Sequence, residues 1–279
     1  LPLGVMPGAP YSQVTTNEAL SGTVGIQYRP SEDAMFYATY NRGFKAGGVN
    51  LDVNAFGVLG NVGADATAIY KPETIDGFEA GLKLDWLDRR ARTNIAVFYN
   101  TIKDLQVAQF LGLRFAIVNA PSAEVYGMEI EQTFKLSKNL TLNGGVTWLP
   151  KATYGNDAII GTLAGRRFST APELAGNIAL SGETPINDSL AITGRVQVQH
   201  TGRVFTNPVT NDQERPITLV DANIGIKSLN ADWRIEGWVH NLFNTTYVTS
   251  HFNTPLQTGD INAYLGAPRT YGVTLRGSF

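Results

Sequence analysis

Hydrophobic and polar residues alternate with a period of two along most of the chain. Between Phe78 and Trp86, one set of alternate positions reads Phe, Ala, Leu, Leu, Trp and the other reads Glu, Gly, Lys, Asp. Successive side chains of a strand point to opposite faces, so each such segment predicts a β-strand with one apolar and one polar face. We predict eleven strands, near residues 20–29, 33–43, 74–87, 91–107, 122–136, 139–152, 172–182, 189–201, 217–228, 231–241 and 268–279.

The connections between these segments alternate between short and long. The short, turn-like ones are 30–32, 88–90, 137–138, 183–188 and 228–230, and the long ones are 44–73, 108–121, 153–171, 202–216 and 242–267. In an up-and-down barrel, every second connection lies at the same rim, and outer-membrane barrels have short periplasmic turns and long external loops. The fold class we predict is therefore all-β, an antiparallel up-and-down transmembrane β-barrel. A soluble sandwich has the same strand alternation but does not account for the rhythm of the loops.

Aromatic residues recur near the ends of the predicted strands. Such residues form girdles at the two membrane interfaces of a barrel, although aromatics also favour strands in general. The candidates for a girdle are Tyr28, Tyr40, Trp86, Tyr99, Trp148, Trp233 and Tyr271.

Composition excludes several classes of protein. Net charge is −2, which provides no global basic field for nucleic acid. The chain has no cysteine, so disulfides and thiolate metal sites are excluded. It contains no run of 18 apolar residues that would predict a transmembrane helix, and its first residues do not resemble a signal peptide.

Motifs for catalysis or metal binding are absent from the sequence. HExxH, CxxC and GxSxG spacings do not occur, and the glycine-rich stretch GFKAGG at 43–48 lacks the spacing of a phosphate loop. His200, His240 and His251 are far apart, and His240 falls on a polar strand face. We predict a protein that is not an enzyme, with no catalytic residue, no metal and no cofactor. Carboxylates on the polar faces are interpreted as charges lining a wide barrel, namely Glu79, Asp85, Glu129 and Glu131.

Six stretches, in this order, resemble the C-terminal half of the barrel of a TonB-dependent outer-membrane receptor. They are FYATYNRGFKAGGVN (36–50), KPETIDGFEAGLKLDW (71–86), NIAVFYNTIKDLQV (94–107), VNAPSAEVYGMEIE (118–131), WVHNLFNTTY (238–247) and PRTYGVTLRGSF (268–279). The resemblance implies a 22-stranded barrel around an N-terminal plug, in the outer membrane of a Gram-negative bacterium. It also implies uptake of a ferric siderophore, energised by the inner-membrane TonB complex through the plug. Haem, cobalamin and glycans are the substrates in other branches of the family.

The resemblance covers the barrel alone, so we expect residues 1–279 to be one domain and a fragment, supplying the last eleven of 22 strands. We expect the plug to lie outside this sequence, and the chain alone is not expected to transport. The ending YGVTLRGSF resembles the last strand that the barrel-assembly machinery reads, with Tyr271, Val273, Leu275 and Phe279 on the lipid side. Gly277 departs from the family, which commonly has an aromatic or apolar residue there. We expect the outer edge of this strand to be unpaired, or wrongly paired with 20–29.

Basic and aromatic residues of the long loops are the candidates for ligand binding, because they suit an anionic, partly aromatic ferric siderophore. The alternative for these arginines is contact with phosphates of lipopolysaccharide, which together with outer-membrane lipid is an expected partner. A passive porin-like barrel and an outer-membrane barrel enzyme remain alternative functions. The candidate ligand-binding residues are Arg114, Arg166, Arg167, Arg203, Arg215, Phe168, Phe205 and Tyr264.

Overall fold

The computed structural model describes residues 14–50, 69–110, 115–156, 163–207, 212–254, 257 and 259–277. Eleven strands of this part form one antiparallel sheet in chain order, which confirms the all-β, up-and-down prediction. The strands are β1 (Gly22–Ser31), β2 (Ala34–Lys45), β5 (Glu73–Trp86), β6 (Ala91–Phe110), β7 (Phe115–Lys135), β8 (Leu140–Tyr154), β9 (Leu174–Pro185), β10 (Leu190–Thr201), β13 (Ile217–Ser228), β14 (Trp233–His240) and β17 (Thr270–Gly277).

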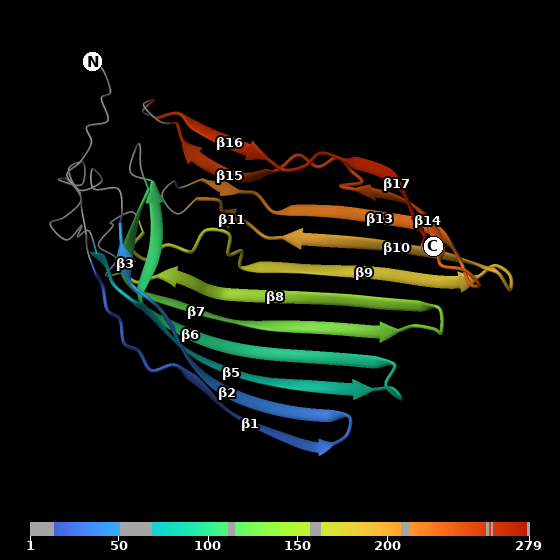
Figure 1. Cartoon of the computed structure of the whole chain (residues 1–279), viewed down its shortest axis with the longest axis horizontal. Helices are drawn as coiled ribbons and strands as arrows, with labels where there is room; N and C mark the ends of the chain where they lie inside the picture. Colours follow the sequence, from blue (N-terminus) through green and yellow to red (C-terminus); the bar gives the residue numbers. More distant parts are fainter. Residues whose placement is uncertain are drawn as a thin grey trace.

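The strands lie side by side in a curved wall, with the two kinds of connection at opposite ends (Figure 1). The short turns, such as the one between β1 and β2, are at one end, which we name the turn end. The longer connections are at the other, the loop end. Three of the long connections contain two-stranded hairpins of their own, which we had not predicted. These are β3 (Gly48–Val49) with β4 (Ile69–Tyr70), β11 (Val204–Phe205) with β12 (Gln213–Glu214), and β15 (Val248–Asn253) with β16 (Ile261–Leu265).

The predicted loop at 108–121 is wrong, because β6 and β7 continue through most of it. Their pairing extends from Ala91↔Phe134 to Phe110↔Phe115 and passes Pro121, the last residue of the predicted loop. Proline cannot donate a ladder hydrogen bond, but the pairing resumes on its far side at Leu105↔Ala120. Apolar residues continue into this extension, and they pack against the loop that follows β8.

The register places the apolar residues on one shared face. Directly paired residues of neighbouring strands point to the same side, and Phe78 pairs with Tyr40 and Tyr99, which in turn pairs with Tyr126. This face is exposed along the whole sheet, as seen for Phe78 (55%), Val97 (48%), Ile178 (49%), Val196 (49%) and Ile224 (62%). A soluble sandwich would bury such a face against a second sheet, whereas a membrane barrel leaves it open to lipid.

Aromatic rings border this exposed face at two levels. Towards the loop end, the Tyr40 and Phe78 ring centroids are 5.0 Å apart; towards the turn end, Trp86 and Phe134 are 6.0 Å apart. The eight steps of the strand from Phe78 to Trp86 extend roughly 26 Å, close to the ~25 Å apolar band of outer-membrane barrels. The other girdle candidates lie exposed on the same face, namely Tyr28, Tyr99, Trp148, Trp233 and Tyr271.

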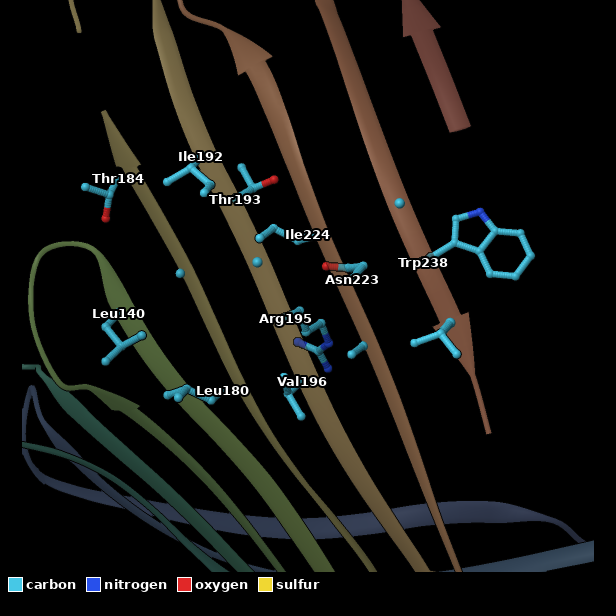
Figure 2. A pocket seen from close by; sticks show the side chains of 15 residues that line it. Leu140, Leu180, Thr184, Ile192, Thr193, Arg195, Val196, Asn223, Ile224 and Trp238 are labelled. Carbon is cyan, nitrogen blue, oxygen red and sulfur yellow. The ribbon is translucent and has the colours of Figure 1, made fainter. Parts of the chain in front are cut away.

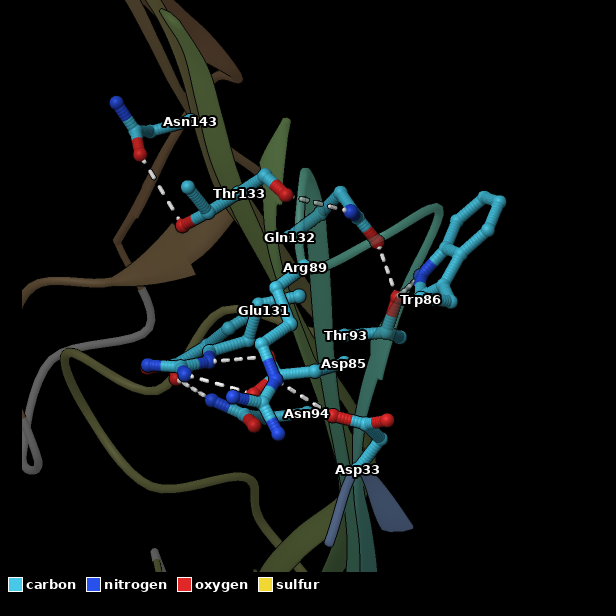
Figure 3. A network of polar contacts seen from close by, with 11 residues as sticks. Asp33, Asp85, Trp86, Arg89, Thr93, Asn94, Glu131, Gln132, Thr133 and Asn143 are labelled. Carbon is cyan, nitrogen blue, oxygen red and sulfur yellow. Dashed lines mark hydrogen bonds and ion pairs between the residues drawn. The ribbon is translucent and has the colours of Figure 1, made fainter. Parts of the chain in front are cut away.

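The opposite face carries polar contacts between neighbouring strands (Figure 3). The Asp85 carboxylate accepts hydrogen bonds from Arg92 at 2.6 and 2.8 Å, and Arg89 joins the turn after β5 to Asp33 in the turn after β1 at 2.7 Å. Two carboxylates that we had assigned to this face are thus found in cross-strand contacts: Asp85, and Glu131, which accepts a bond from Asn94 at 3.1 Å. These contacts stiffen the turn end of the sheet without a hydrophobic core.

Buried apolar residues gather at the loop end instead. Val107, Ala120, Tyr154 and Leu163 form one cluster, in which Leu163 is completely buried. The cluster joins the extended β6–β7 pair to the connection between β8 and β9. This packing gives the loop end a fixed framework from which side chains can be positioned.

Both edges of the sheet are open in the described part of the chain. There, β1 pairs only with β2 and β17 only with β14. The outer edge of the last strand is therefore unpaired, as expected, and it is not paired with residues 20–29. In β17, Tyr271 (78%), Val273 (72%) and Leu275 (74%) are exposed on the apolar face, as predicted. Phe279 lies outside the described residues.

Gly272 in β17 provides a test of the packing on the polar face. A Cβ atom at this position would meet the ring of Trp238, the directly paired residue of β14, whose indole N–H donates to Thr274 at 3.1 Å. Gly272→Val is therefore expected to displace the ring and destabilise the last strand by about 1–3 kcal/mol, as overpacking usually does. Gly237→Val is the matched control, because a Cβ there meets no atom closer than 3.9 Å. Urea unfolding of the two variants in detergent micelles would contradict the account if both lost the same stability.

Candidate functional site

The connection between β8 and β9 turns back and pairs with the end of β8. Tyr154 donates its backbone N–H to Arg166 at 2.9 Å, Phe168 donates to Ala152 at 2.8 Å, and Thr153 forms a bridge with Arg167. Extended backbone sends successive side chains to opposite sides. Arg167 therefore lies on the side of Thr153, which the register assigns to the apolar face, whereas Arg166 and Phe168 lie on the polar side.

Arg167 is a structural anchor of this connection. Its guanidinium donates to the carbonyl oxygen of Ala171 at 2.7 Å, to that of Pro150 at 3.5 Å and to that of Leu149. Burial lowers the pKa of the Arg167 guanidinium, and the nearby Glu173 carboxylate partly opposes this effect. A partly buried arginine that binds three carbonyl oxygens holds the two strand ends together. We had predicted a contact with ligand, and no sequence pattern indicates the anchoring role.

Arg167→Gln is expected to loosen the connection between β8 and β9. A glutamine amide does not reach all three carbonyl oxygens, and a buried acceptor left without a donor costs about 1–3 kcal/mol. Limited proteolysis of the folded protein should therefore cleave the region of 163–171 several-fold faster in the variant. Lys138→Gln removes a positive charge at the turn end and serves as the control. Equal cleavage rates in the variant and the wild type would contradict the anchoring role.

Arg166 and Phe168 each contact an aromatic ring. The Arg166 guanidinium lies over the Phe205 ring, 5.0 Å from its centroid, and Phe168 packs edge-on against Tyr154 at 4.6 Å. The backbone of β11 is tied to the same connection, since Thr170 donates to Phe205 at 2.8 Å. Two loops that are distant in sequence thus present a cation next to aromatic rings at the loop end, an arrangement suited to anionic or aromatic ligands.

Arg203 belongs to a cavity of about 560 Å³ that also contains Trp148, Leu174, His200 and Phe205 in its lining. Trp148 pairs with Leu174, and His200 pairs with Gly176, two residues further along β9, so all three side chains belong to the apolar face. The cavity therefore opens on the outside of the wall. It brings three of the predicted residues together, namely Arg167, Arg203 and Phe205.

Three other candidates are not part of this cluster. Arg215 follows β12 and donates to the Thr246 carbonyl oxygen at 3.3 Å. Tyr264 in β16 is exposed (64%) and lies 5.0 Å from the ring of Phe252. Arg114 lies outside the described residues. The structure thus brings together five of the eight predicted residues, in the connections after β8 and β10: Arg166, Arg167, Phe168, Arg203 and Phe205.

Two further cavities lie along the wall itself. One of about 340 Å³ opens on the polar face and is lined by Glu129, Glu131 and Gln199, among others. The other is an apolar groove of about 730 Å³ across β8 to β14, with Leu140, Leu180, Ile192 and Val196 around it (Figure 2). Its aliphatic lining on the exposed face is what a surface in contact with hydrocarbon requires.

Asn241 is an important residue that the sequence reasoning missed. It is 5% exposed, directly follows β14 and has a φ of 50°. Its side-chain amide donates to Thr245 at 2.9 Å and to Ala267 at 3.1 Å, and its oxygen accepts from the Thr245 N–H at 2.8 Å. The stretch WVHNLFNTTY contained the signal, because asparagine tolerates positive φ and satisfies backbone groups in turns.

The described residues contain no group of three or more His, Asp or Glu side chains that could hold a metal ion. They also contain no helix long and apolar enough to cross a membrane. His251 is engaged instead in a contact between its ring Nδ1 and the Thr206 hydroxyl, and His240 Nδ1 lies 3.3 Å from Asp221.

An antiparallel up-and-down sheet with an exposed apolar face and a polar opposite face has the architecture of the wall of a transmembrane β-barrel. Residues 2–242 match the family described as "TonB dependent receptor-like, beta-barrel", and the chain belongs to this family. The members are receptors and transporters of the Gram-negative outer membrane, and the predicted resemblance to the barrel of a TonB-dependent receptor is confirmed.

Individual relatives support the same fold. The chain is 21% identical to the pesticin receptor of Yersinia pestis over 99% of its own length and 39% of that protein. The ferric yersiniabactin uptake receptor FyuA of Yersinia pestis superposes with a TM-score of 0.76 at 19% identity, over 93% of this chain and 37% of that one. The ferric-catecholate import receptor Fiu of E. coli superposes with a TM-score of 0.67 at 21% identity, over 98% of this chain and 37% of that one. The chain thus spans about two fifths of the length of these relatives.

Proposed function

We propose that the chain is part of the barrel wall of an outer-membrane receptor that takes up a ferric siderophore with energy from the TonB complex. The observation that carries this proposal is the family match over residues 2–242, together with structural neighbours that are siderophore receptors. We further propose that residues 1–279 form a single unit of this barrel. Strands from elsewhere in the complete receptor would pair with the open edges of β1 and β17, because unpaired backbone groups are costly in lipid.

The proposed direction of the wall follows from its two ends. Short turns face the periplasm in outer-membrane barrels, so the loop end with Arg166 and Phe205 would face the outside. There the guanidinium of Arg166 provides positive charge on the polar side of the wall, where a ligand entering the barrel passes. Ferric siderophores are commonly anionic, and charge-assisted contacts to arginine suit their donor oxygens. Arg114, Arg215 and Tyr264 stay predictions for the same role.

Uptake by cells tests the proposal. Under iron limitation, cells that produce the complete receptor should accumulate 55Fe from at least one of a panel of catecholate, hydroxamate and mixed siderophores, and the uptake should stop when the proton-motive force is collapsed. The absence of uptake for the whole panel would direct the search to haem, cobalamin or glycans. Uptake that persists without the proton-motive force would favour a passive porin.

Arg166 is the residue to substitute once a ligand is found. Arg166→Gln is expected to weaken binding of the ferric siderophore by about tenfold, the loss of a charge-assisted contact of roughly 1.5 kcal/mol. Lys138→Gln at the turn end, which also removes one positive charge, should leave binding unchanged. Quenching of tryptophan fluorescence by the ligand measures both variants. Equal affinities for Arg166→Gln and the wild type would remove Arg166 from the proposed site.

A further inference from the structure

The cavity around Arg203 lies on the opposite side of the wall from the lumen. Its lining contains Trp148, Leu174 and His200 from the apolar face. The residues next to these in sequence belong to the polar face, and Thr147, Ala175 and Thr201 line the inner cavity; His200 is in the lining of both cavities, whereas Trp148, Leu174 and Arg203 line the outer one alone. The two cavities therefore open to different sides of the same strands, and the Arg203 cavity faces the surroundings of the barrel.

The apolar part of the cavity is continuous with the lipid-facing surface. Trp148 and Leu174 are each 44% exposed, and Val146 (39%) and Ile178 (49%) follow on the same face towards the turn end. Tryptophan is enriched at the level of the lipid headgroups. The cavity thus begins where the hydrocarbon-facing band ends, on the side of the proposed outer leaflet.

The polar part of the cavity has an excess of positive charge. Arg203 is exposed, and within the described part of the chain its side chain has no hydrogen-bond or ion-pair partner. Arg167 contributes a second guanidinium, whose bonds go to neutral carbonyl oxygens. Glu173 contributes one carboxylate, and His200 and Gln213 add polar groups. Two arginines against one carboxylate leave a net positive site, which favours an anion with several acceptor oxygens.

We propose that this cavity binds a phosphate group of a phosphorylated glycolipid in the outer leaflet, with Arg203 as the principal contact and with Trp148 and Leu174 against the lipid chain. A phosphate provides the acceptor oxygens that guanidinium groups match, and the adjoining apolar surface provides a place for the chain of the same molecule. The proposal rests on the membrane orientation proposed above, and it assigns Arg203 to lipid, whereas Arg166, which does not line this cavity, remains the candidate for the siderophore.

Binding of purified diphosphoryl lipid A to the complete receptor in detergent micelles, measured by native mass spectrometry, tests this site. Arg203→Gln is expected to weaken binding by tenfold or more, Arg203→Lys by less, and Glu173→Gln should strengthen it several-fold. Lys138→Gln, at the turn end, should have no effect. Unchanged affinity in Arg203→Gln would overturn the proposal.

Two further binding measurements distinguish a phosphate carried by a lipid from free inorganic phosphate. Fully dephosphorylated lipid A should bind the wild type at least tenfold more weakly, and inorganic phosphate alone at equal concentration should not displace the lipid. Equal binding of the dephosphorylated lipid, or displacement by inorganic phosphate, would overturn the choice of ligand. Uptake of 55Fe-siderophore per folded receptor should be the same for Arg203→Gln and the wild type. Lack of uptake in the wild type would count against the proposed function alone, because lipid binding is measured separately.

Discussion

Replacing Ile95 with arginine is expected to destabilise the inserted barrel by about 2–4 kcal/mol, the cost of a cation on the lipid face near the middle of the membrane. Ile95 pairs with Leu82 and Ile130 on the apolar face. It lies between the two aromatic levels, four residues from Tyr99 towards the loop end and four from Ala91 towards the turn end. The residues that pair with Ile95, Leu82 and Ile130, offer an arginine neither a carboxylate nor another polar group.

The neighbouring position provides a matched control. Asn94 lies on the polar face, where it donates to Glu131 at 3.1 Å and pairs with Lys83. Asn94→Arg introduces the same side chain one residue away, next to an available carboxylate, and should cost less than about 1 kcal/mol, as for an exposed ion pair. Urea titration of folding into lipid vesicles, followed by tryptophan fluorescence, measures the difference. If both arginines had the same effect, the two faces would not differ in environment.

Removing the side chain of Asn241 is the second substitution with a large expected effect. Asn241→Ala leaves the N–H and C=O of Thr245 and the C=O of Ala267 without their side-chain partners in a partly buried turn. These groups are only partly buried, since Thr245 is half-buried and Ala267 is exposed, so we expect a total cost of about 1–3 kcal/mol. Alanine also tolerates the positive φ of this position less well than asparagine does.

The consequence of Asn241→Ala should be felt in the last strand, because Ala267 leads directly into β17. We expect a large fraction of the variant to fail to assemble, visible as loss of the heat-modifiable folded band on gels. Asn244→Gly is the control, since Asn244 also has a positive φ (53°), and its side chain makes a single bond, to the Arg269 N–H at 2.9 Å. Assembly of Asn241→Ala as complete as that of the control would contradict the role of this turn.

The strands of the wall were predictable because the sheet has one apolar and one polar face, so that apolar and polar side chains must alternate along each strand. The segment predicted at 74–87 is found as β5 at Glu73–Trp86, and the one at 268–279 includes β17 at Thr270–Gly277. The extension of β6 and β7 was missed, because Pro121 interrupts the strand pattern in the sequence whereas the ladder continues on both sides of it. The hairpins β3–β4 and β11–β12 were missed because two-residue strands are too short for a periodic pattern. The longer strands β15 and β16 were missed because the whole of 242–267 was predicted as a loop.

The loop residues were predictable as a set but not in their individual roles. Arg166 and Arg167 are adjacent, and sequence alone does not reveal which of two neighbouring side chains points inward, since a shift of one residue exchanges the faces. Pairing with β8 decides this, and it leaves Arg167 bound to carbonyl oxygens. The side of Arg203 likewise becomes visible only in the fold, where this residue lines a cavity together with Trp148 and Leu174 of the apolar face. Sequence identified the chemistry available at the loop end, and the fold distributes it between lumen and lipid.

In the proposed orientation, the apolar face of this sheet meets lipid and the polar face lines a barrel. The chain has no cysteine, so single cysteines along β13 can carry a bimane fluorophore in the complete receptor, reconstituted in vesicles with or without brominated lipids. Brominated lipid should quench the fluorophore strongly at Ala222, Ile224 and Ile226 and little at Asn223 and Lys227. Quenching that does not alternate, or that is strongest at Asn223 and Lys227, would contradict it.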